Sequence, residues 1–332
     1  MDLSVNKNIV VIGGGTGSFT VLSGLKKYTS NLTAIVNMAD DGGSTGQLRD
    51  ELGVLPPGDV RQCLVALSSS PKLRDLFNYR FTGGSFEGHA FGNLFLTALE
   101  KMTGSFAEAV DIADEVLRVK GRVVPITLEN VQLVMKKPGS QDIIGEYKIG
   151  NMAFKINEQR PILELSPRAD INPDARQAII DADFIVIAPG NLYGSLAPAL
   201  LVDGVEGALL QTKAKVLYVC NLVTKPGQTD NFSVNDFAGE IERFMKGRRL
   251  DIVLYNTKAP EKRLLNKYQT DHEYLVRVDN DLLTNSHFRA VGTSLISNKE
   301  VVHDEHDKIS AGRSLIRHDS DILAKEIIKL ID

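Results

Sequence analysis

The sequence predicts an α/β protein with a Rossmann-like, doubly wound and mostly parallel sheet, and three observations carry this prediction. Short runs of β-branched and other apolar residues recur along the 332 residues. Amphipathic segments of helical period separate them, and glycine-bearing loops follow several of the runs. Alternation of buried strands with helices is typical of a parallel sheet covered on both faces. Since no linker interrupts the pattern, we expect a single domain over residues 1–332.

The predicted strands are short and largely apolar, as expected for strands that are buried on both faces. They cover residues 8–12, 32–38, 183–190, 215–220 and 251–256. The predicted helices have apolar residues on one face. They cover residues 18–28, 59–67, 90–102 and 235–246, and a last helix over residues 319–330 begins at a cap formed by Asp319 or Ser320.

Residues 120–166 have a different pattern. Apolar residues alternate at Val131, Leu133 and Met135, and a turn sequence, Lys-Pro-Gly-Ser, follows at residues 137–140. Alternation of this kind predicts half-buried strands joined by a turn. We therefore expect a small β-rich excursion within the single domain.

The composition excludes several classes of function. Charged residues make up 24% of the chain and the formal net charge is −4, so binding of nucleic acid or of an anionic membrane is not expected. No apolar run is long enough for membrane insertion, and the amino terminus has no basic leader. We expect a cytoplasmic protein in which Cys63 and Cys220, without metal-ligand spacing, are small buried apolar residues.

The strongest functional signal is a glycine-rich turn between the first strand and the first helix. Its residues are Gly13, Gly14, Gly15, Thr16, Gly17 and Ser18. Glycines permit positive φ angles and let backbone N–H groups approach an anion, and the start of the helix adds donors and a favourable dipole. These six residues are the predicted contacts of a phosphate group. A tight turn without a ligand is the alternative.

The spacing of this turn argues against redox cofactors. The dinucleotide fingerprint requires a glycine where Ser18 stands, and no acidic residue ends the second strand in the expected manner. No Lys-Ser or Lys-Thr pair follows the turn, which excludes a P-loop. We expect a bound nucleotide or nucleotide-sugar, and neither NAD nor a redox flavin.

Two adjacent acidic residues, Asp40 and Asp41, follow the second predicted strand in the sequence Asn-Met-Ala-Asp-Asp-Gly-Gly-Ser-Thr-Gly. They fall at the carboxyl edge of the sheet, where α/β proteins bind ligands. Carboxylates beside a phosphate site suit Mg²⁺. Asx turns in a loop without a metal are an equally good interpretation.

Further candidate ligands are spread along the chain. Arg61 stands in the first turn of a helix, where its charge opposes the helix dipole, so an anionic partner is expected. Asp59 is expected to cap that helix, and His89 to have a structural role. The loops after residues 183–190 and 215–220 add four polar residues: Asn191, Ser195, Asn221 and Lys225. Tyr268 and Arg317 are candidates for stacking on a base or binding an anion.

Five stretches taken together resemble one family over nearly the full chain. They read VVIGGGTGSFTVLSGLK, VNMADDGGSTGQLRDELGVLPPGDVRQCL, HAFGNLFLTAL, IAPGNLYGSLAPALLV and CNLVTKPGQT. The family is that of the YvcK-like gluconeogenesis factors, which are similar to the 2-phospho-L-lactate transferase CofD. The resemblance implies a nucleotide-binding Rossmann-like core, with Gly13 to Ser18 as the phosphate turn and with Asp40 and Asp41 as the acidic pair that holds the metal in the transferase.

The resemblance also implies further site residues. Asn191, Ser195 and Asn221 fall in loop motifs of the family. Tyr268 and Arg317 lie in the C-terminal region where the regulator branch contacts a UDP-sugar.

The resemblance implies two functions, one for each branch. Resemblance to the gluconeogenesis factors implies that the ligand is a UDP-sugar such as UDP-N-acetylglucosamine. It also implies a role in cell shape and in growth on gluconeogenic carbon. The transferase implies a GDP-linked donor, magnesium and a deazaflavin acceptor. The sequence GGSTGQLRDELGVLPPGDVRQ after Asp41 has the form of the regulator branch, which favours a binding protein over an enzyme. Self-association and contacts with cell-shape proteins are open questions. A third alternative is that the protein is a structural partner of the cell-shape machinery and that its nucleotide is vestigial.

Overall fold

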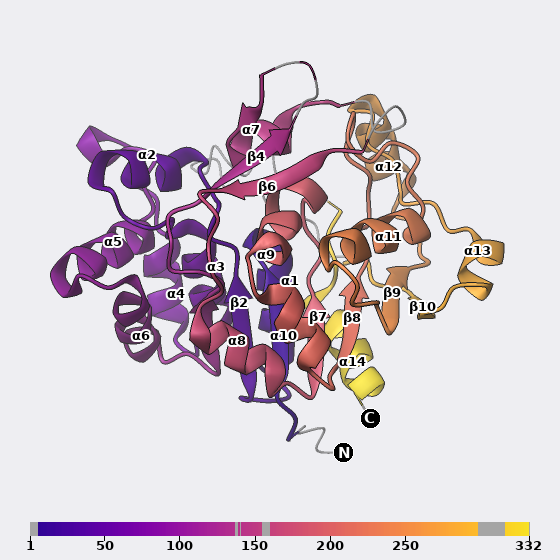
Figure 1. Cartoon of the computed structure of the whole chain (residues 1–332), viewed down its shortest axis with the longest axis horizontal. Coiled ribbons are helices and arrows are strands. Elements are labelled where there is room, and N and C mark those ends of the chain that lie inside the picture. Colours follow the sequence, from indigo (N-terminus) through magenta and orange to yellow (C-terminus); the bar gives the residue numbers. More distant parts are fainter. Residues whose placement is uncertain (1–5, 137–138, 140, 155–159, 298–315, 332) are drawn as a thin grey trace.

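The computed structural model describes residues 6–136, 139, 141–154, 160–297 and 316–331. Within these residues the central sheet has seven strands, all parallel, in the order β10-β9-β8-β7-β1-β2-β3 (Figure 1). The strands are β1 Ile9–Gly13, β2 Leu32–Val36, β3 Arg122–Pro125, β7 Phe184–Ile187, β8 Lys215–Val219, β9 Ile252–Asn256 and β10 Arg289–Thr293. The expected fold class is confirmed.

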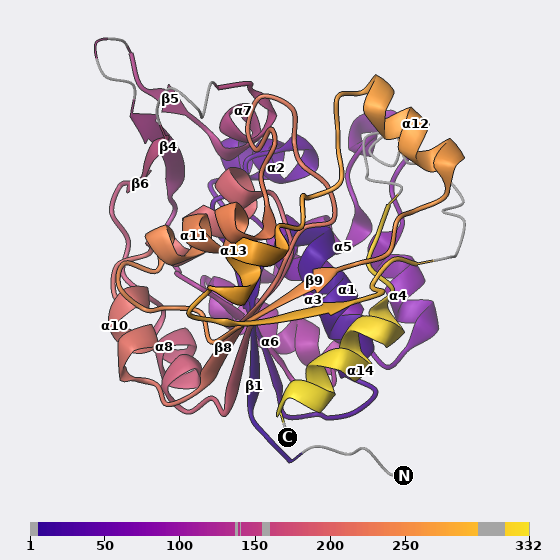
Figure 2. The same cartoon turned by 90° about the vertical axis from the view of Figure 1, so that its right-hand side faces the viewer.

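Helices cover both faces of this sheet. In Figure 2, α8, α10 and α11 lie on one side of the strands, and α1, α3 and α14 lie on the other. The first group is α8 Pro173–Ile180, α9 Ala197–Leu201, α10 Val205–Gln211 and α11 Val234–Phe244. The second side carries α1 Gly15–Leu25, α3 Gly58–Leu67, α4 Pro71–Asn78, α5 Phe91–Thr103, α6 Phe106–Leu117 and α14 Ser320–Ile331. Strands β1 and β7 are buried throughout, because helices pack on both of their faces.

A small antiparallel sheet stands apart from the central one, with strand order β5-β4-β6. Its strands are β4 Gln132–Lys136, β5 Ile143–Ile144 and β6 Ile162–Ser166. Figure 1 shows this sheet and α7, Glu146–Asn151, above the carboxyl ends of the central strands. The β-rich excursion therefore exists, but it begins later than residue 120, because β3 pairs with β2 as an edge strand of the central sheet. The predicted turn at residues 137–140 lies, apart from Gly139, outside the described residues.

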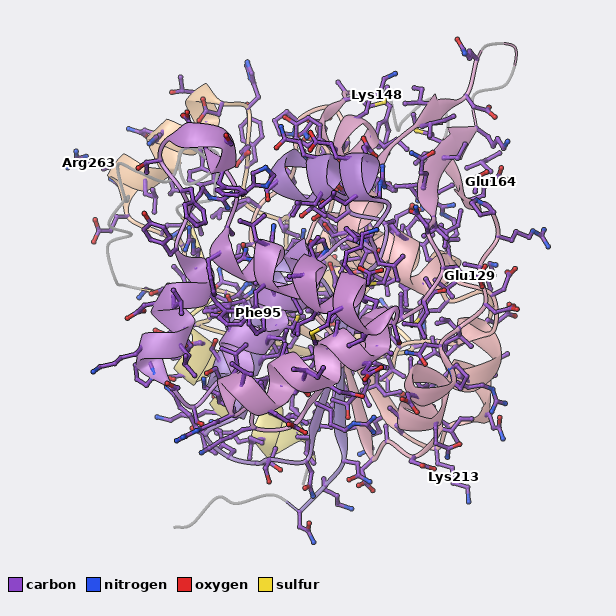
Figure 3. The ribbon with its side chains drawn as sticks, turned by 90° about the vertical axis from the view of Figure 1, so that its left-hand side faces the viewer. Phe95, Glu129, Lys148, Glu164, Lys213 and Arg263 are labelled. Atoms are coloured by element: carbon purple, nitrogen blue, oxygen red, sulfur yellow. The ribbon has the colours of Figure 1, made fainter. Side chains whose placement is uncertain are left out.

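The remaining elements lie in the connections between those already described. They are α2 Gly43–Leu52, α12 Lys262–Thr270, α13 Asn280–Thr284, η1 Gly84–Phe86 and η2 Leu192–Leu196. A layer of aromatic rings joins α4 to α5, where Phe77 packs edge-on against Phe95 at 5.0 Å between ring centroids (Figure 3). Among the described helices, none is both long and apolar enough to cross a bilayer.

The helix that follows β1 begins three residues before its predicted start at residue 18. Gly15 is already helical and Gly14 is the N-cap, so the glycine turn is itself the first turn of α1. At the other end of the chain, the carboxylate of Asp319 accepts hydrogen bonds from the N–H groups of Asp321 and Ile322. The predicted cap of the last helix is therefore confirmed for Asp319.

Candidate functional site

The candidate site lies at the carboxyl edge of the central sheet, between β1 and β7. From β1 the chain proceeds to β2 and β3 on one side, and later to β7, β8 and β9 on the other. Strand order thus reverses at β1, and parallel α/β sheets open a crevice for ligands at such a reversal. The glycine turn stands directly at this point.

Glycine is required at two positions of this turn, Gly15 and Gly17, for different structural reasons. Gly15 has a φ angle of +60°, which is left-handed and favours glycine, and its neighbourhood is open apart from Asp59. Gly17 packs against backbone: a Cβ there would stand 1.6 Å from the carbonyl oxygen of Pro189, in the loop after β7. Gly15 therefore shapes the open face of the turn, and Gly17 permits the close packing of α1 on the neighbouring loop.

The two hydroxyl groups of the turn have different surroundings. Thr16 is exposed at the start of α1. Ser18 is 2% exposed, and its Oγ atom has no hydrogen-bond partner among the described residues. It lies under the turn, where a Cβ on Gly13 would be 2.7 Å from it. A buried hydroxyl without a partner is unusual in proteins and is available to a ligand or a water molecule.

The carboxylate of Asp59 reaches the amino end of α1. It accepts a hydrogen bond from the N–H of Gly15, and a Cβ on Gly14 would stand 2.1 Å from its Oδ2 atom. Burial and the charge of Asp40 raise the pKa of Asp59 to about 8. The prediction that Asp59 caps α3 is wrong, because Pro57 is the N-cap and makes no side-chain cap. Asp59 instead joins the start of α3 to the glycine turn.

Asp40, Asp59 and Glu146 form an acidic cluster at this edge. Asp40 accepts the N–H of Gly42 at 3.0 Å, which is the Asx turn of the alternative interpretation. Burial raises the pKa of Asp40. Burial and the charges of Asp40, Asp59 and Asp41 raise the pKa of Glu146 to about 8, and Lys225 acts in the opposite direction. The three carboxyl groups therefore hold their protons to higher pH than exposed carboxyl groups do.

Asp41 points to α7, away from its neighbour in sequence. Its Oδ1 atom accepts the N–H of Tyr147 at 2.6 Å, so it binds the amino end of that helix. At the other end of α7, the side chain of Gln228 donates to the carbonyl groups of Ile149, Gly150 and Met152 at 2.8 to 3.0 Å. The loops after β2 and β8 therefore hold α7 over the site, and α7 brings Glu146 into the acidic cluster.

Asn191 and Asn221 organise the loops after β7 and β8. Asn191 is the N-cap of η2, where it accepts the N–H of Gly194, and it donates to the carbonyl of Gly150 at 3.2 Å. Asn221 exchanges two hydrogen bonds with the backbone of Gly190, at 2.7 and 3.3 Å. Ser195 lies within η2, and its N–H donates to the carbonyl of Asn191. These three predicted ligands stand at the correct sheet edge, and the two asparagines have roles in positioning loops.

Lys225 follows in the loop after β8. Its backbone N–H donates to the hydroxyl of Thr229 at 2.7 Å. Burial lowers the pKa of its ammonium group, while Glu146 and Glu273 raise it. The side chain is therefore a partly buried cation that faces the acidic cluster, as a group that neutralises phosphate would.

Arg61 lies deeper than expected, in a polar network beneath α2. Its guanidinium donates to Asn93 at 2.8 Å and to Asn78 at 2.7 Å. Asn93 donates in turn to Ser44, whose hydroxyl pairs with Nδ1 of His89 at 2.9 Å. The structural role expected for His89 is in agreement with this network, which joins the starts of α2, α3 and α5.

Tyr268 and the segment that contains Arg317 lie together. The hydroxyl of Tyr268 accepts the N–H of Ile316 at 2.8 Å, and its ring packs with Leu222, Ile296 and Ile316. The carbonyl of Arg317 accepts the N–H of Ser297. Because Leu222 follows β8, this cluster adjoins the loops of the candidate site.

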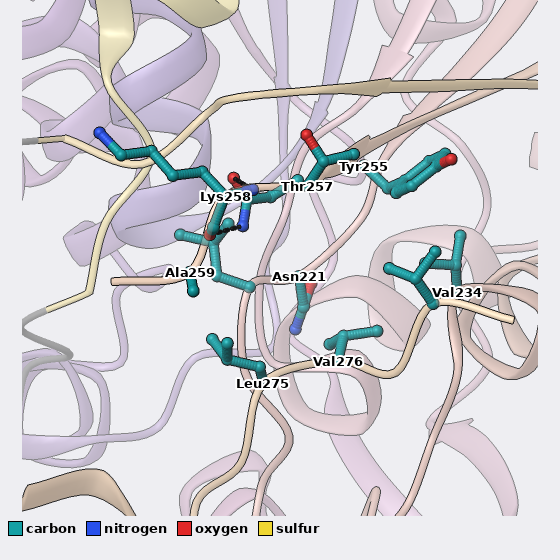
Figure 4. Close-up of a pocket in the computed structure, with 11 residues that line it drawn as sticks. Asn221, Val234, Tyr255, Thr257, Lys258, Ala259, Leu275 and Val276 are labelled. Atoms are coloured by element: carbon teal, nitrogen blue, oxygen red, sulfur yellow. Dashed lines mark hydrogen bonds between the residues drawn. The ribbon is translucent and has the colours of Figure 1, made fainter. Parts of the chain in front are cut away.

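Leu222 also lines a cavity at the ends of β8 and β9 (Figure 4). Its volume is about 150 Å³. Apolar side chains form much of its wall, and the lining also includes Asn221, which is bonded to Gly190 in the loop after β7. The lining includes Leu222, Val234, Tyr255, Leu275, Val276 and Val278. A cavity of this size admits a single six-membered ring.

Four residues of the site lay outside the sequence-based expectations. Glu146 and Gln228 meet the site only because α7 folds back over it, and Tyr147 is 106 residues from Asp41. Arg49, on α2, is 7% exposed, and its charge acts on Asp40. Its Nη1 atom is buried without a hydrogen-bond partner in the described part of the chain. Only the helical spacing that puts Arg49 one turn after Thr45 could have indicated it.

The chain is similar to known proteins over nearly its whole length. The model of the 2-phospho-L-lactate transferase CofD family matches residues 9–297. A gluconeogenesis factor from Halalkalibacterium halodurans is 36% identical over 97% of this chain and 96% of its own length. The chain belongs to the CofD-related gluconeogenesis factor family.

Other members of the family agree with this assignment. The gluconeogenesis factor of Listeria innocua is 40% identical over 80% of this chain and 82% of its own length. A crystal structure of a UPF0052 family protein from Bacillus halodurans superposes with a TM-score of 0.84 at 32% identity, covering 97% of this chain and 99% of that one. The resemblance noted in the sequence is therefore confirmed at the level of family and fold.

Proposed function

We propose that this gluconeogenesis factor binds a nucleotide-sugar, first of all a UDP-sugar, and acts as a regulator of cell morphogenesis and cell-wall homeostasis during growth on gluconeogenic carbon. The observation that carries the proposal is the arrangement of two features along one sheet edge. A glycine turn at the start of α1 stands at the end of β1, and a cavity large enough for one ring stands at the ends of β8 and β9. The two lie about 12 Å apart at the usual strand spacing.

The turn supplies the diphosphate end of the proposed ligand. No residue of α1, α2 or α3 caps the amino end of its own helix with a side chain, and at α1 the carboxyl group of Asp59 takes the N–H of Gly15 only. Helix starts present N–H donors and a positive dipole. Ser18 adds a buried hydroxyl and Lys225 a positive charge. Together these groups match the chemistry of a diphosphate.

The cavity supplies the base end. Its apolar walls suit the faces of a planar ring, and Asn221 in its lining can position polar groups of a nucleoside. A nucleoside diphosphate is long enough to join the cavity to the turn, so one ligand can occupy both. Tyr268 and Arg317 lie beyond Leu222 and belong in this proposal to the sugar and base contacts.

Magnesium is proposed as part of the ligand complex. Within the described residues no group of three or more acidic, histidine or cysteine side chains has metal-binding geometry. Mg²⁺ usually takes one or two carboxylates and completes its shell with phosphate oxygens and water. Asp40 fits this role better than Asp41, whose Oδ1 is bound to Tyr147, and Asp59 faces the same space. The ion would lower the mutual repulsion of carboxylates and phosphate.

Calorimetric titration tests the proposal. Purified protein is titrated with UDP-N-acetylglucosamine and with GDP, each with and without Mg²⁺. Gly15→Val should abolish binding while unfolding stays cooperative, because a side chain on the open face of the turn blocks the phosphates. Gly207→Val is the matched control, since a Cβ on Gly207, within α10, would have no neighbour within 4 Å. Undiminished affinity of Gly15→Val would refute the phosphate site.

A second pair of variants tests the base end. Val276→Phe fills the cavity and should weaken UDP-N-acetylglucosamine binding while inorganic pyrophosphate still binds. Val116→Phe, on the exposed face of α6, is the control. Equal affinity of Val276→Phe and wild type would place the base elsewhere.

The acidic cluster favours one alternative, a magnesium-dependent phospho-acyl transferase that uses a GDP-linked donor. In that case Asp40 and Asp59 would hold Mg²⁺, which supplies charge stabilisation as a phosphoanhydride breaks. Tighter binding of GDP than of UDP-N-acetylglucosamine would support this enzyme, as would release of GMP when the GDP-linked donor and a deazaflavin acceptor are added together, the phospho-acyl group passing to the acceptor.

The regulatory role is tested in cells. A strain that lacks the gene should lose normal shape on a gluconeogenic carbon source, and the wild-type gene should restore it. If Gly15→Val restores shape as well as wild type, a bound nucleotide is not needed for the role, and a structural partner of the cell-shape machinery becomes the better description. Chemical crosslinking in the same strain would identify protein partners and self-association.

A further inference from the structure

A second cavity lies at the opposite edge of the molecule, at the amino ends of the central strands. Its volume is about 500 Å³, within the range of small-molecule sites. It is lined by Asn6, Lys26, Lys27, Tyr28, Thr29, Ser30, Asn31 and Lys120. Asn31 directly precedes β2, and Lys120 stands shortly before β3. Helix α1 begins at the glycine turn and ends here, so its 11 residues separate the two sites by about 16 Å.

The cavity is strongly basic on a chain whose formal net charge is −4. None of its described lining residues is acidic. The charges that act on the ammonium group of Lys26 are those of Arg74, Lys120 and Lys27, and all three are positive. Lys27 also pairs with Asp321 on α14. Around Lys26 and Lys120, positive charge therefore gathers at one place.

Lys26 is held in position at the wall of this cavity. Its Nζ atom donates to the carbonyl of Ser68 at 2.8 Å. An ammonium group has three donors, so two remain for a ligand. Burial, together with the three neighbouring cations, lowers the pKa of Lys26 to about 8. An anion in the cavity would relieve this repulsion.

Arg74 is not part of the lining, but its charge acts on Lys26 from behind the wall. Its Nε atom is buried and makes no hydrogen bond within the part of the chain that the structure describes. The hydroxyls of Thr29 and Ser30 and the phenol of Tyr28 complete a wall of donors. Lysine ammonium groups combined with hydroxyl and amide donors are typical of phosphate recognition.

We propose that this basic cavity is a second ligand site, separate from the nucleotide site, and that it binds the phosphate group of a small phosphorylated metabolite. The volume exceeds that of a single phosphate, so an organic portion fits beside Tyr28. The proposal does not depend on the nucleotide site, because α1 keeps the two apart.

Binding of glycerol 2-phosphate, measured by calorimetry on the full chain, tests the proposal. Lys120→Glu should weaken this affinity about tenfold, because it reverses a charge at the cavity. Lys26→Gln should have a similar effect. Lys213→Glu, an exposed lysine in the loop before β8 (Figure 3), makes the same change in net charge and should have no effect.

Gly15→Val distinguishes this site from the glycine turn. The variant should keep the affinity for glycerol 2-phosphate. Loss of that affinity in Gly15→Val, equal losses in Lys213→Glu and Lys120→Glu, or no binding by wild type would each overturn the proposal. Since Lys120 is exposed, Lys120→Glu should unfold like wild type, so its loss of binding reports on the cavity and not on the fold.

Discussion

The tight packing of α1 on the loop after β7 can be tested by a single methyl group. Gly17→Ala places a Cβ 1.6 Å from the carbonyl oxygen of Pro189, whereas ordinary contacts begin at 3.4 Å. Helix or loop must therefore move by about 1.8 Å, the difference between these values. Both belong to backbone in a packed core, so the rearrangement should cost about 1–3 kcal/mol.

The matched variant is Gly207→Ala. Gly207 lies within α10, and a Cβ there has no neighbour within 4 Å. Alanine is the better helix former by about 1 kcal/mol, so this variant should be as stable as wild type or more stable. Because Gly17 is also helical, the gain in helix propensity is common to both variants, and their free energies of unfolding should differ by the packing cost alone, about 1–3 kcal/mol.

Urea unfolding followed by far-ultraviolet circular dichroism measures this difference, provided that the dependence on urea concentration is equal for both variants. Gly17→Ala should unfold at lower urea. If the two variants unfold at the same urea concentration, α1 does not approach Pro189 as closely as described. Gly17 would then have to be explained by a ligand and not by packing.

Three further predictions concern two buried carboxyl groups and the hydrogen bonds that hold α7 in place. The pKa of Asp59 is raised to about 8, so the native state keeps a proton that the unfolded state, with a carboxyl pKa of about 4, has released. The stabilisation is complete below about pH 4 and is lost as the pH rises through about 8. Asp59→Asn should flatten this loss between about pH 4 and about pH 8, measured by urea unfolding. An unchanged slope in this range would contradict the prediction. Gln228→Ala removes the donor to the carbonyls of Ile149, Gly150 and Met152 at the end of α7, although Gly150 keeps its bond from Asn191, and should cost about 1–3 kcal/mol. Relative to wild type, amide hydrogen exchange should become faster in α7 and not in α11, and equal changes in the two helices would contradict the prediction. Glu240→Ala removes the buried carboxylate that binds Arg243, Arg160 and the hydroxyl of Tyr193. The free energy of unfolding, measured in urea, should fall by about 3–5 kcal/mol. A loss as small as that of a surface variant would refute a buried charge network.

The sequence by itself determined the class of fold and the place of the glycine turn. Apolar runs such as residues 184–187 are short and bounded by turn residues, which is a local property, and burial on both faces follows from it. The turn after β1 was equally readable, because a strand, a glycine cluster and a helix stand next to one another in the chain. Asp319 was readable as a cap for the same reason.

The tertiary structure decided which polar residues meet at the site. Asp40 and Asp41 are neighbours in the chain, yet Asp40 turns back on its own loop and Asp41 binds α7. No periodicity carries that information, since it depends on where α7 settles when the small sheet folds over the strands. Asp59 looked like a helix cap, and only the packing of α3 against α1 brings its carboxylate to Gly14. Local pattern reports what one segment buries, whereas contacts between segments far apart in the chain are fixed by the packing of the whole core.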